Sequence, residues 1–97
     1  MKILNYQLTS HFEERMKIRH IPEFLISLCL VKGEIKTTTK NKKEYSLNQN
    51  YILEAVSQGY LTVAECLCIK KIVVIAKKNF LITTYATYGD KGINYSN

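Results

Sequence analysis

The stretch that decides how this chain folds is residues 10–22, SHFEERMKIRHIP. Its pattern predicts a short helix that ends before Pro22, because the residue preceding a proline avoids the helical region of the backbone. Ser10 and Glu13 have the spacing of a capping box, in which the hydroxyl accepts from an unpaired amide and the carboxylate reaches back. We therefore expect the helix to begin at Ser10.

His11 and Arg15 are one turn apart in this helix, so their side chains share one face. Phe12 and Met16 form the adjacent stripe, which we expect to face the core. A titratable imidazole beside a permanent cation suits phosphate chemistry. The same pair also occurs on ordinary surface helices, where an arginine forms a weak ion pair with a nearby glutamate.

The chain has 97 residues and is expected to form a single domain, residues 1–97, because no linker or repeat divides it. Fourteen lysines and arginines against eight aspartates and glutamates give a net charge of +6. A small basic domain favours polyanionic partners such as RNA, DNA or anionic lipid, although charge also serves solubility alone. No signal segment or bilayer-length apolar run is seen, so we expect a cytoplasmic protein that binds no membrane.

The three cysteines, Cys29, Cys66 and Cys68, are an odd number, which favours reduced thiols over disulfides. Cys66 and Cys68 are too close together for the usual zinc motif and are better explained as small buried hydrophobes. The chain also has no phosphate-binding loop and no His-Glu-x-x-His motif. We therefore expect no metal site and no cofactor.

The rest of the chain divides into a second helix and a set of strands. Pro22 suits the first turn of that helix, which continues to about Val31 and has Gly33 as its C-terminal cap. From Glu34 onward the pattern favours strands, although the segment 51–56 also fits a helical turn. The expected fold is α+β, with two N-terminal helices packed on a twisted antiparallel β-sheet. The expected strands are 34–39, 44–47, 51–56, 60–69, 72–76 and 80–85.

The last expected strand supplies two more candidates, Thr83 and Tyr85, because alternate residues of a strand share a face. If the first helix packs across the sheet, these hydroxyls face His11 and Arg15 across a groove. Threonine and tyrosine are also common in strands of any function. Alternation gives two sets: Leu81, Thr83 and Tyr85 on one face, and Phe80, Ile82 and Thr84 on the other.

Cleavage of RNA without a metal needs a set of this kind. One group removes the proton of the 2′-hydroxyl, one neutralises the phosphorane, and one protonates the leaving 5′-oxygen. We assign His11 the role of general base or acid and Arg15 that of phosphate stabiliser. Thr83 and Tyr85 are expected to position the phosphate.

Basic residues near this set are expected to supply affinity for RNA. The lysine clusters at 40–43, 70–71 and 77–78 fall at expected turns, where a solvated lysine is the ordinary interpretation. Gathered on one side of the molecule, they would form a phosphate-binding rim. The expected substrate-binding residues are Arg19, Lys42, Lys43, Lys77 and Lys78.

Motifs at the two ends of the chain carry a family resemblance. The first comprises Ser10, His11, Arg15, Met16, Arg19 and Ile21, followed by a helix and its exit at 32–35; the second is Ile82-Thr83-Thr84-Tyr85. Together they resemble a family of small bacterial domains of unknown function. That family is similar to the barnase–EndoU–colicin–RelE (BECR) group of metal-independent ribonuclease toxins, including RelE-like proteins. The resemblance implies two N-terminal helices against a twisted antiparallel sheet.

The resemblance also implies an activity, that of a ribonuclease toxin from a toxin–antitoxin or interbacterial competition system. Its site would be carried by the positions of His11, Arg15, Thr83 and Tyr85. Its substrate would be tRNA or mRNA, and its protein partner an acidic antitoxin or immunity protein. The alternative is a non-catalytic basic module that docks on RNA or a protein partner. An immunity protein fits least well, because inhibitors of basic nucleases tend to be acidic.

Overall fold

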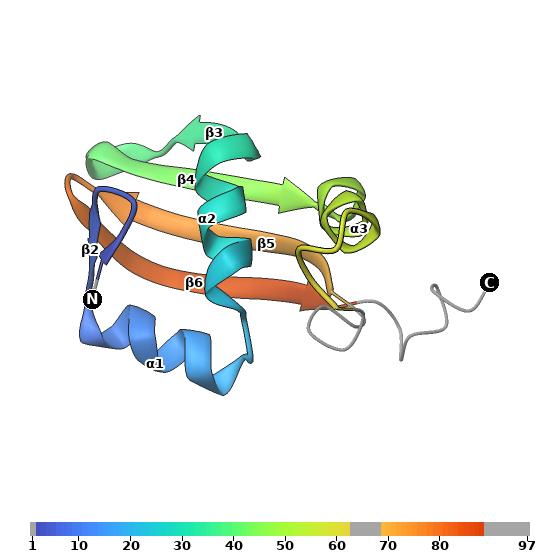
Figure 1. Cartoon of the computed structure of the whole chain (residues 1–97). Helices are drawn as coiled ribbons and strands as arrows, with labels where there is room; N and C mark the ends of the chain where they lie inside the picture. The colour runs from blue at the N-terminus through green and yellow to red at the C-terminus, as the bar shows by residue number, and fades with distance from the viewer. Residues whose placement is uncertain (1, 63–68, 89–97) are drawn as a thin grey trace.

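The computed structural model describes residues 2–62 and 69–88 and has the expected α+β fold class (Figure 1). One helix crosses a face of the sheet, one runs along its edge, and one lies at its end. The helices are α1 (Ser10–Ile18), α2 (Glu23–Lys32) and α3 (Gln49–Ser57), with a 3-10 turn, η1, at Thr39–Asn41. The strands are β1 (Lys2–Ile3), β2 (Tyr6–Leu8), β3 (Glu34–Thr37), β4 (Lys42–Asn48), β5 (Ile69–Lys77) and β6 (Phe80–Tyr88).

The described strands form one sheet in the order β1-β2-β6-β5-β4-β3. Strand β2 runs parallel to β6, with Gln7 opposite Phe80, whereas the other neighbours are antiparallel. The expectation of a purely antiparallel sheet is therefore wrong at this edge. Strands β1 and β2 have only two and three residues, which is too few for alternation to be visible in the sequence.

Helix α1 begins at Ser10 as predicted, but its N-terminal cap is Thr9 rather than Ser10. The Thr9 hydroxyl accepts a hydrogen bond from the Phe12 amide at 3.1 Å. It also lies 3.1 Å from the carbonyl oxygen of Leu81, in β6. The Thr9 cap therefore both fixes the start of α1 and attaches the helix to β6.

The hydrophobic core lies between α2 and the sheet. Helix α2 buries Leu25, Ile26 and Cys29, while α1 contributes Phe12 with Met16 packed beside it. The predicted core stripe of α1 is therefore confirmed. The largest apolar side chains that the sheet buries completely in this core are Leu47, Ile72, Val74 and Leu81.

Strand β6 contains a bulge at Ile82. Pairing with β5 passes from Leu81 directly to Thr83, so Ile82 has no partner there. The extra residue shifts the alternation, so that Leu81 and Thr84 both face the core and are fully buried. The expectation that Leu81 shares a face with Thr83 and Tyr85 is therefore wrong, although Thr83 and Tyr85 do share one.

The segment 51–56 belongs to helix α3, so the helical alternative for it is correct and the strand is not. Asn48 caps this helix, because its side chain accepts from the Asn50 amide at 2.9 Å. The expected strand 60–69 falls mostly outside the described residues, and so do Cys66 and Cys68; residues 60–62 form no strand. Within the described ranges, none of the helices has the length and apolar character that a membrane crossing requires.

Candidate functional site

The sheet has one face that points away from α2, which we call the open face. Register fixes its members, because residues next to the core-facing Leu47, Ile72 and Val74 must point the other way. Across the four larger strands the face combines lysines, hydroxyls and exposed aromatic rings. Its members are Glu34, Lys36, Lys42, Glu44, Ser46, Asn48, Lys71, Val73, Ile75, Lys77, Phe80, Thr83, Tyr85 and Thr87.

Thr83 and Tyr85 lie midway along β6, opposite Ile75 and the buried Val73 of β5. Tyr85 is 40% exposed, so part of this residue is accessible to a ligand. The neighbouring Thr84 is not, because it is buried and its hydroxyl donates to the Val73 carbonyl at 2.8 Å.

His11 and Arg15 share a face of α1 as predicted. The Arg15 Nε donates to the His11 Nε2 across 3.4 Å, a long contact that requires the neutral imidazole with a free lone pair. Helix α1 lies beside β6 (Figure 1). In the described part of the chain, no hydrogen bond joins either side chain to Thr83 or Tyr85.

The expected substrate-binding residues are spread over different surfaces. Lys42 and Lys77 lie opposite each other on the open face. Lys43 points to the α2 side of β4, and Lys78 lies in the β5–β6 turn with a φ of 55°. Arg19 ends α1, where its carbonyl accepts from the Tyr88 hydroxyl and its buried Nε has no partner among the described residues.

The expectation that the lysine clusters sit in turns is mostly wrong. Lys42 and Lys43 begin strand β4, while Lys70 and Lys71 lie in strand β5. Lysine disfavours strands only weakly, and the buried residues that follow each pair decide the local structure. Because neighbouring strand residues point to opposite faces, Lys42 and Lys43 are divided between the two sides of the sheet. Lys70 lies at an irregularity of β5, where the pairing with β6 passes from Ile69 directly to Lys71.

A polar pocket at one end of the open face was not found by sequence reasoning. It has a volume of about 320 Å³ and brings two lysines together with hydroxyl, amide and carboxylate groups. These residues come from α2, three strands and α3, so no local motif indicates them. The lining residues are Lys32, Glu34, Ser46, Asn48, Tyr51 and Lys71.

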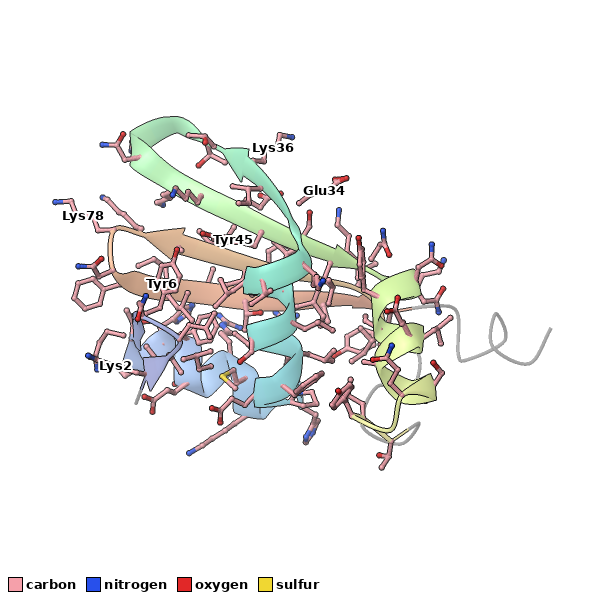
Figure 2. The ribbon with its side chains drawn as sticks, turned by 45° about the horizontal axis from the view of Figure 1, so that its top comes forward. Lys2, Tyr6, Glu34, Lys36, Tyr45 and Lys78 are labelled. Atoms are coloured by element: carbon pink, nitrogen blue, oxygen red, sulfur yellow. The ribbon has the colours of Figure 1, made fainter. Side chains whose placement is uncertain are left out.

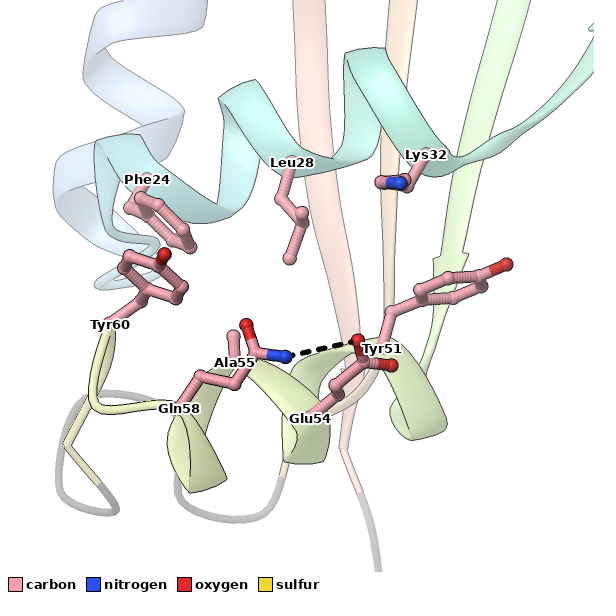
Figure 3. A pocket seen from close by; sticks show the side chains of 8 residues that line it. All are labelled: Phe24, Leu28, Lys32, Tyr51, Glu54, Ala55, Gln58 and Tyr60. Atoms are coloured by element: carbon pink, nitrogen blue, oxygen red, sulfur yellow. Dashed lines mark hydrogen bonds between the residues drawn. The ribbon is translucent and has the colours of Figure 1, made fainter.

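A second cavity, of about 280 Å³, lies between α2 and α3 and is mainly apolar (Figure 3). At one end of it the rings of Phe24 and Tyr60 stack with centroids 5.5 Å apart. Leu28 points into it from α2, and Gln58 donates to Glu54 along its α3 side. None of the predicted catalytic or substrate-binding residues lines this cavity.

Two buried titratable groups lie inside the core rather than at a site. Burial raises the pKa of the Cys29 thiol to about 12, so at neutral pH the group is no nucleophile. Burial and the nearby Tyr6 hydroxyl raise the pKa of Tyr45 to about 12 as well. The two tyrosine hydroxyls are 2.8 Å apart (Figure 2). The described residues contain no cluster of side chains able to hold a metal ion.

No protein-family model, curated protein or solved structure matches this chain. The class of protein that the structure defines is therefore an α+β domain with three described helices and a mixed sheet. The features of the fold that bear on function are the open face and the helix beside it.

Proposed function

We propose that this domain is a metal-independent ribonuclease of the toxin type, which binds RNA on its open face and cleaves it beside α1. In this proposal the fold is a variant of the barnase–EndoU–colicin–RelE architecture, with an additional helix, α3, and a parallel strand. One observation carries the proposal: Thr83 and Tyr85 share the open face with four lysines, Lys36, Lys42, Lys71 and Lys77.

The chemistry of the open face suits a single strand of RNA. Lysines bind phosphates mainly as point charges, and exposed rings such as Phe80 and Tyr85 offer surfaces on which bases stack. The polar pocket adds Lys32 beside Lys71 at one end of the same face. A phosphodiester chain lying along the strands would meet Lys42, Lys77 and the Phe80 ring at one end, and Lys71 at the other. The Tyr85 ring lies between the two ends.

The handedness of α1 supports a place for His11 and Arg15 beside this face. The helix runs along β6 in the same direction (Figure 1). Phe12 is fully buried in the core between α2 and the sheet. Each residue of a right-handed helix advances about 100°, so Arg15 and His11 trail Phe12 by about 60° and 100°. That rotation directs both side chains to the flank away from α2, next to β6.

In the proposed reaction His11 acts as general base and takes the proton of the 2′-hydroxyl. The 2′-oxygen attacks phosphorus and forms a new P–O bond, the bond to the 5′-oxygen breaks, and water protonates that oxygen. Arg15 turns from the imidazole to the phosphate, where its fork neutralises the added charge. Thr83 and Tyr85 donate hydrogen bonds to the non-bridging oxygens.

The direct test incubates the purified domain with tRNA and with a labelled oligoribonucleotide in the presence of EDTA. We expect cleavage that leaves a 2′,3′-cyclic phosphate, and a loss of at least about 100-fold in His11→Ala, the usual size of a lost acid–base group. The matched control is His20→Asn, because His20 has a φ of 52° that asparagine tolerates. Intact RNA, or equal cleavage by wild type and His11→Ala, would contradict the enzymatic proposal.

A non-catalytic RNA-binding module is the second candidate, and one observation favours it. Arg15 is hydrogen-bonded to His11 rather than to a residue of the open face. For such a module we expect salt-dependent binding of the oligoribonucleotide with no turnover, and equal affinity for an analogue with 2′-deoxy positions. Equal binding by wild type and His11→Ala, without product, would support this candidate over the enzyme.

A further inference from the structure

The two edges of the sheet differ in the length and exposure of their outer strands. Strand β1 ends one side with only two residues, and beyond Leu81 the outer side of β6 is followed by α1. Strand β3 ends the other side with its four residues all exposed, including Ile35 at 61%. An open edge of this kind is a template for another strand.

The hydrogen-bonding groups of this edge can be assigned from its pairing with β4. The Thr38 amide donates to the Lys42 carbonyl at 2.8 Å, which marks a hydrogen-bonded pair next to the strand. Such pairs alternate in an antiparallel ladder, so Lys36 is bonded to β4 and Ile35 is not. The N–H and C=O of Ile35 therefore point outward from the sheet.

The side chains at this edge are complementary in charge to those of the same edge in a second copy of the chain. Figure 2 shows Glu34 and Lys36 at the outer strand, and both belong to the open face. If two β3 strands pair antiparallel with Ile35 opposite Ile35, each Glu34 lies opposite the Lys36 of the other copy. Opposite charges directly across a strand pair are favourable, and the two central residues exchange both backbone bonds.

We propose that this edge binds a second copy of the chain, forming a two-fold symmetric dimer whose β3 strands join two sheets into one. Ile35 of each copy packs against the other on the α2 side of the joined sheet. A two-fold axis perpendicular to the sheet keeps both open faces on the same side. The contact consists of one four-residue strand from each copy, so we expect the dimer to form only at high protein concentration.

Charge reversal tests the register. Sedimentation velocity at increasing concentration is expected to show a dimer for wild type and only monomer for Glu34→Lys and for Lys36→Glu, each of which sets like charges opposite each other. A mixture of the two variants restores complementary charges at every position and is expected to form a heterodimer. The double variant Glu34→Lys/Lys36→Glu is expected to dimerise as wild type does.

A wild type that stays monomeric at its highest soluble concentration would overturn the proposal. So would single variants that dimerise like wild type, or a mixture that stays monomeric. Ile35→Pro supplies an independent variant, because it removes an amide that β4 does not use. It is expected to keep the wild-type melting temperature within a few degrees and to lose the dimer; a dimer retained by this folded variant would also overturn the proposal.

Discussion

The hydroxyl of Thr9 makes two kinds of contact, and the stability of α1 should depend on it. It accepts from the Phe12 amide, and it lies within hydrogen-bond distance of the Leu81 and Ile82 carbonyls. We expect Thr9→Ala to lower the free energy of unfolding by about 1–2 kcal/mol, the upper range for removal of a helix cap. Urea denaturation followed by circular dichroism measures this.

Ser10→Ala is the matched control, because Ser10 is exposed and is the first residue inside the helix. Its effect on the free energy of unfolding should stay within about 0.5 kcal/mol, as for ordinary surface substitutions. A larger loss in Ser10→Ala than in Thr9→Ala would return the cap to Ser10, where the capping-box pattern of the sequence puts it.

Cys29 makes stability depend on pH in the alkaline range. Its folded pKa of about 12 lies above the ordinary value of 9.0, so the folded protein keeps a proton that the unfolded chain releases. The stabilisation is complete below about pH 9 and is lost as pH rises toward 12, by up to about 1.4 kcal/mol per pH unit. In Cys29→Ala the free energy of unfolding should therefore fall less steeply from pH 8.5 to 10.5. Parallel curves for the two proteins would contradict this.

At the scale of elements, the junction of α2 and β3 depends on Gly33. The residue caps α2 as the sequence predicts, but its φ of −71° is ordinary and does not require glycine. A Cβ there would lie 2.4 Å from the Cys29 carbonyl oxygen and 2.8 Å from that of Ser46. The sequence indicates the position of this glycine, whereas only the structure explains it, as the close approach of α2 to β4.

We expect Gly33→Ala to lower the free energy of unfolding by about 1–3 kcal/mol, because two backbone segments have to move apart. Gly59→Ala is the control, because its φ of 83° carries a strain of about 1 kcal/mol while a Cβ there meets no atom within 4 Å. Thermal melts measure the loss of stability in each variant. The loss in Gly33→Ala is steric, whereas that in Gly59→Ala comes only from the backbone conformation. A smaller loss in Gly33→Ala would contradict the close approach.

The two N-terminal helices and most of strands β4 to β6 could be predicted because their apolar periodicity is local. The bulge at Ile82 could not, since its neighbours alternate regularly in the sequence and only the pairing with β5 leaves it unpartnered. The sequence of α3 fits both a strand and a helix, because Ile52 and Ala55 are its only buried residues. Two apolar positions are too few to distinguish a period of two from a period of 3.6.

At the scale of the whole molecule, the candidate site was predictable only in part. Chain-local geometry pairs His11 with Arg15 and Thr83 with Tyr85, and both pairings are present. The grouping of lysines was not predictable, because the face that each lysine occupies depends on strand register. The polar pocket was missed for the same reason, since it is assembled by the order of strands in the sheet.

The measurement that tests the central claim most directly is the salt dependence of RNA binding by matched lysine variants. Lys42 and Lys43 are adjacent in β4 and carry the same charge, yet only Lys42 lies on the open face. For Lys42→Gln, Lys71→Gln and Lys77→Gln we expect weaker binding of a single-stranded oligoribonucleotide. The slope of log affinity against log salt should fall by about 0.7 for each phosphate that the variant no longer neutralises. Lys43→Gln should bind like wild type, whereas equally weakened binding by Lys43→Gln and the three open-face variants would contradict an RNA site on this face.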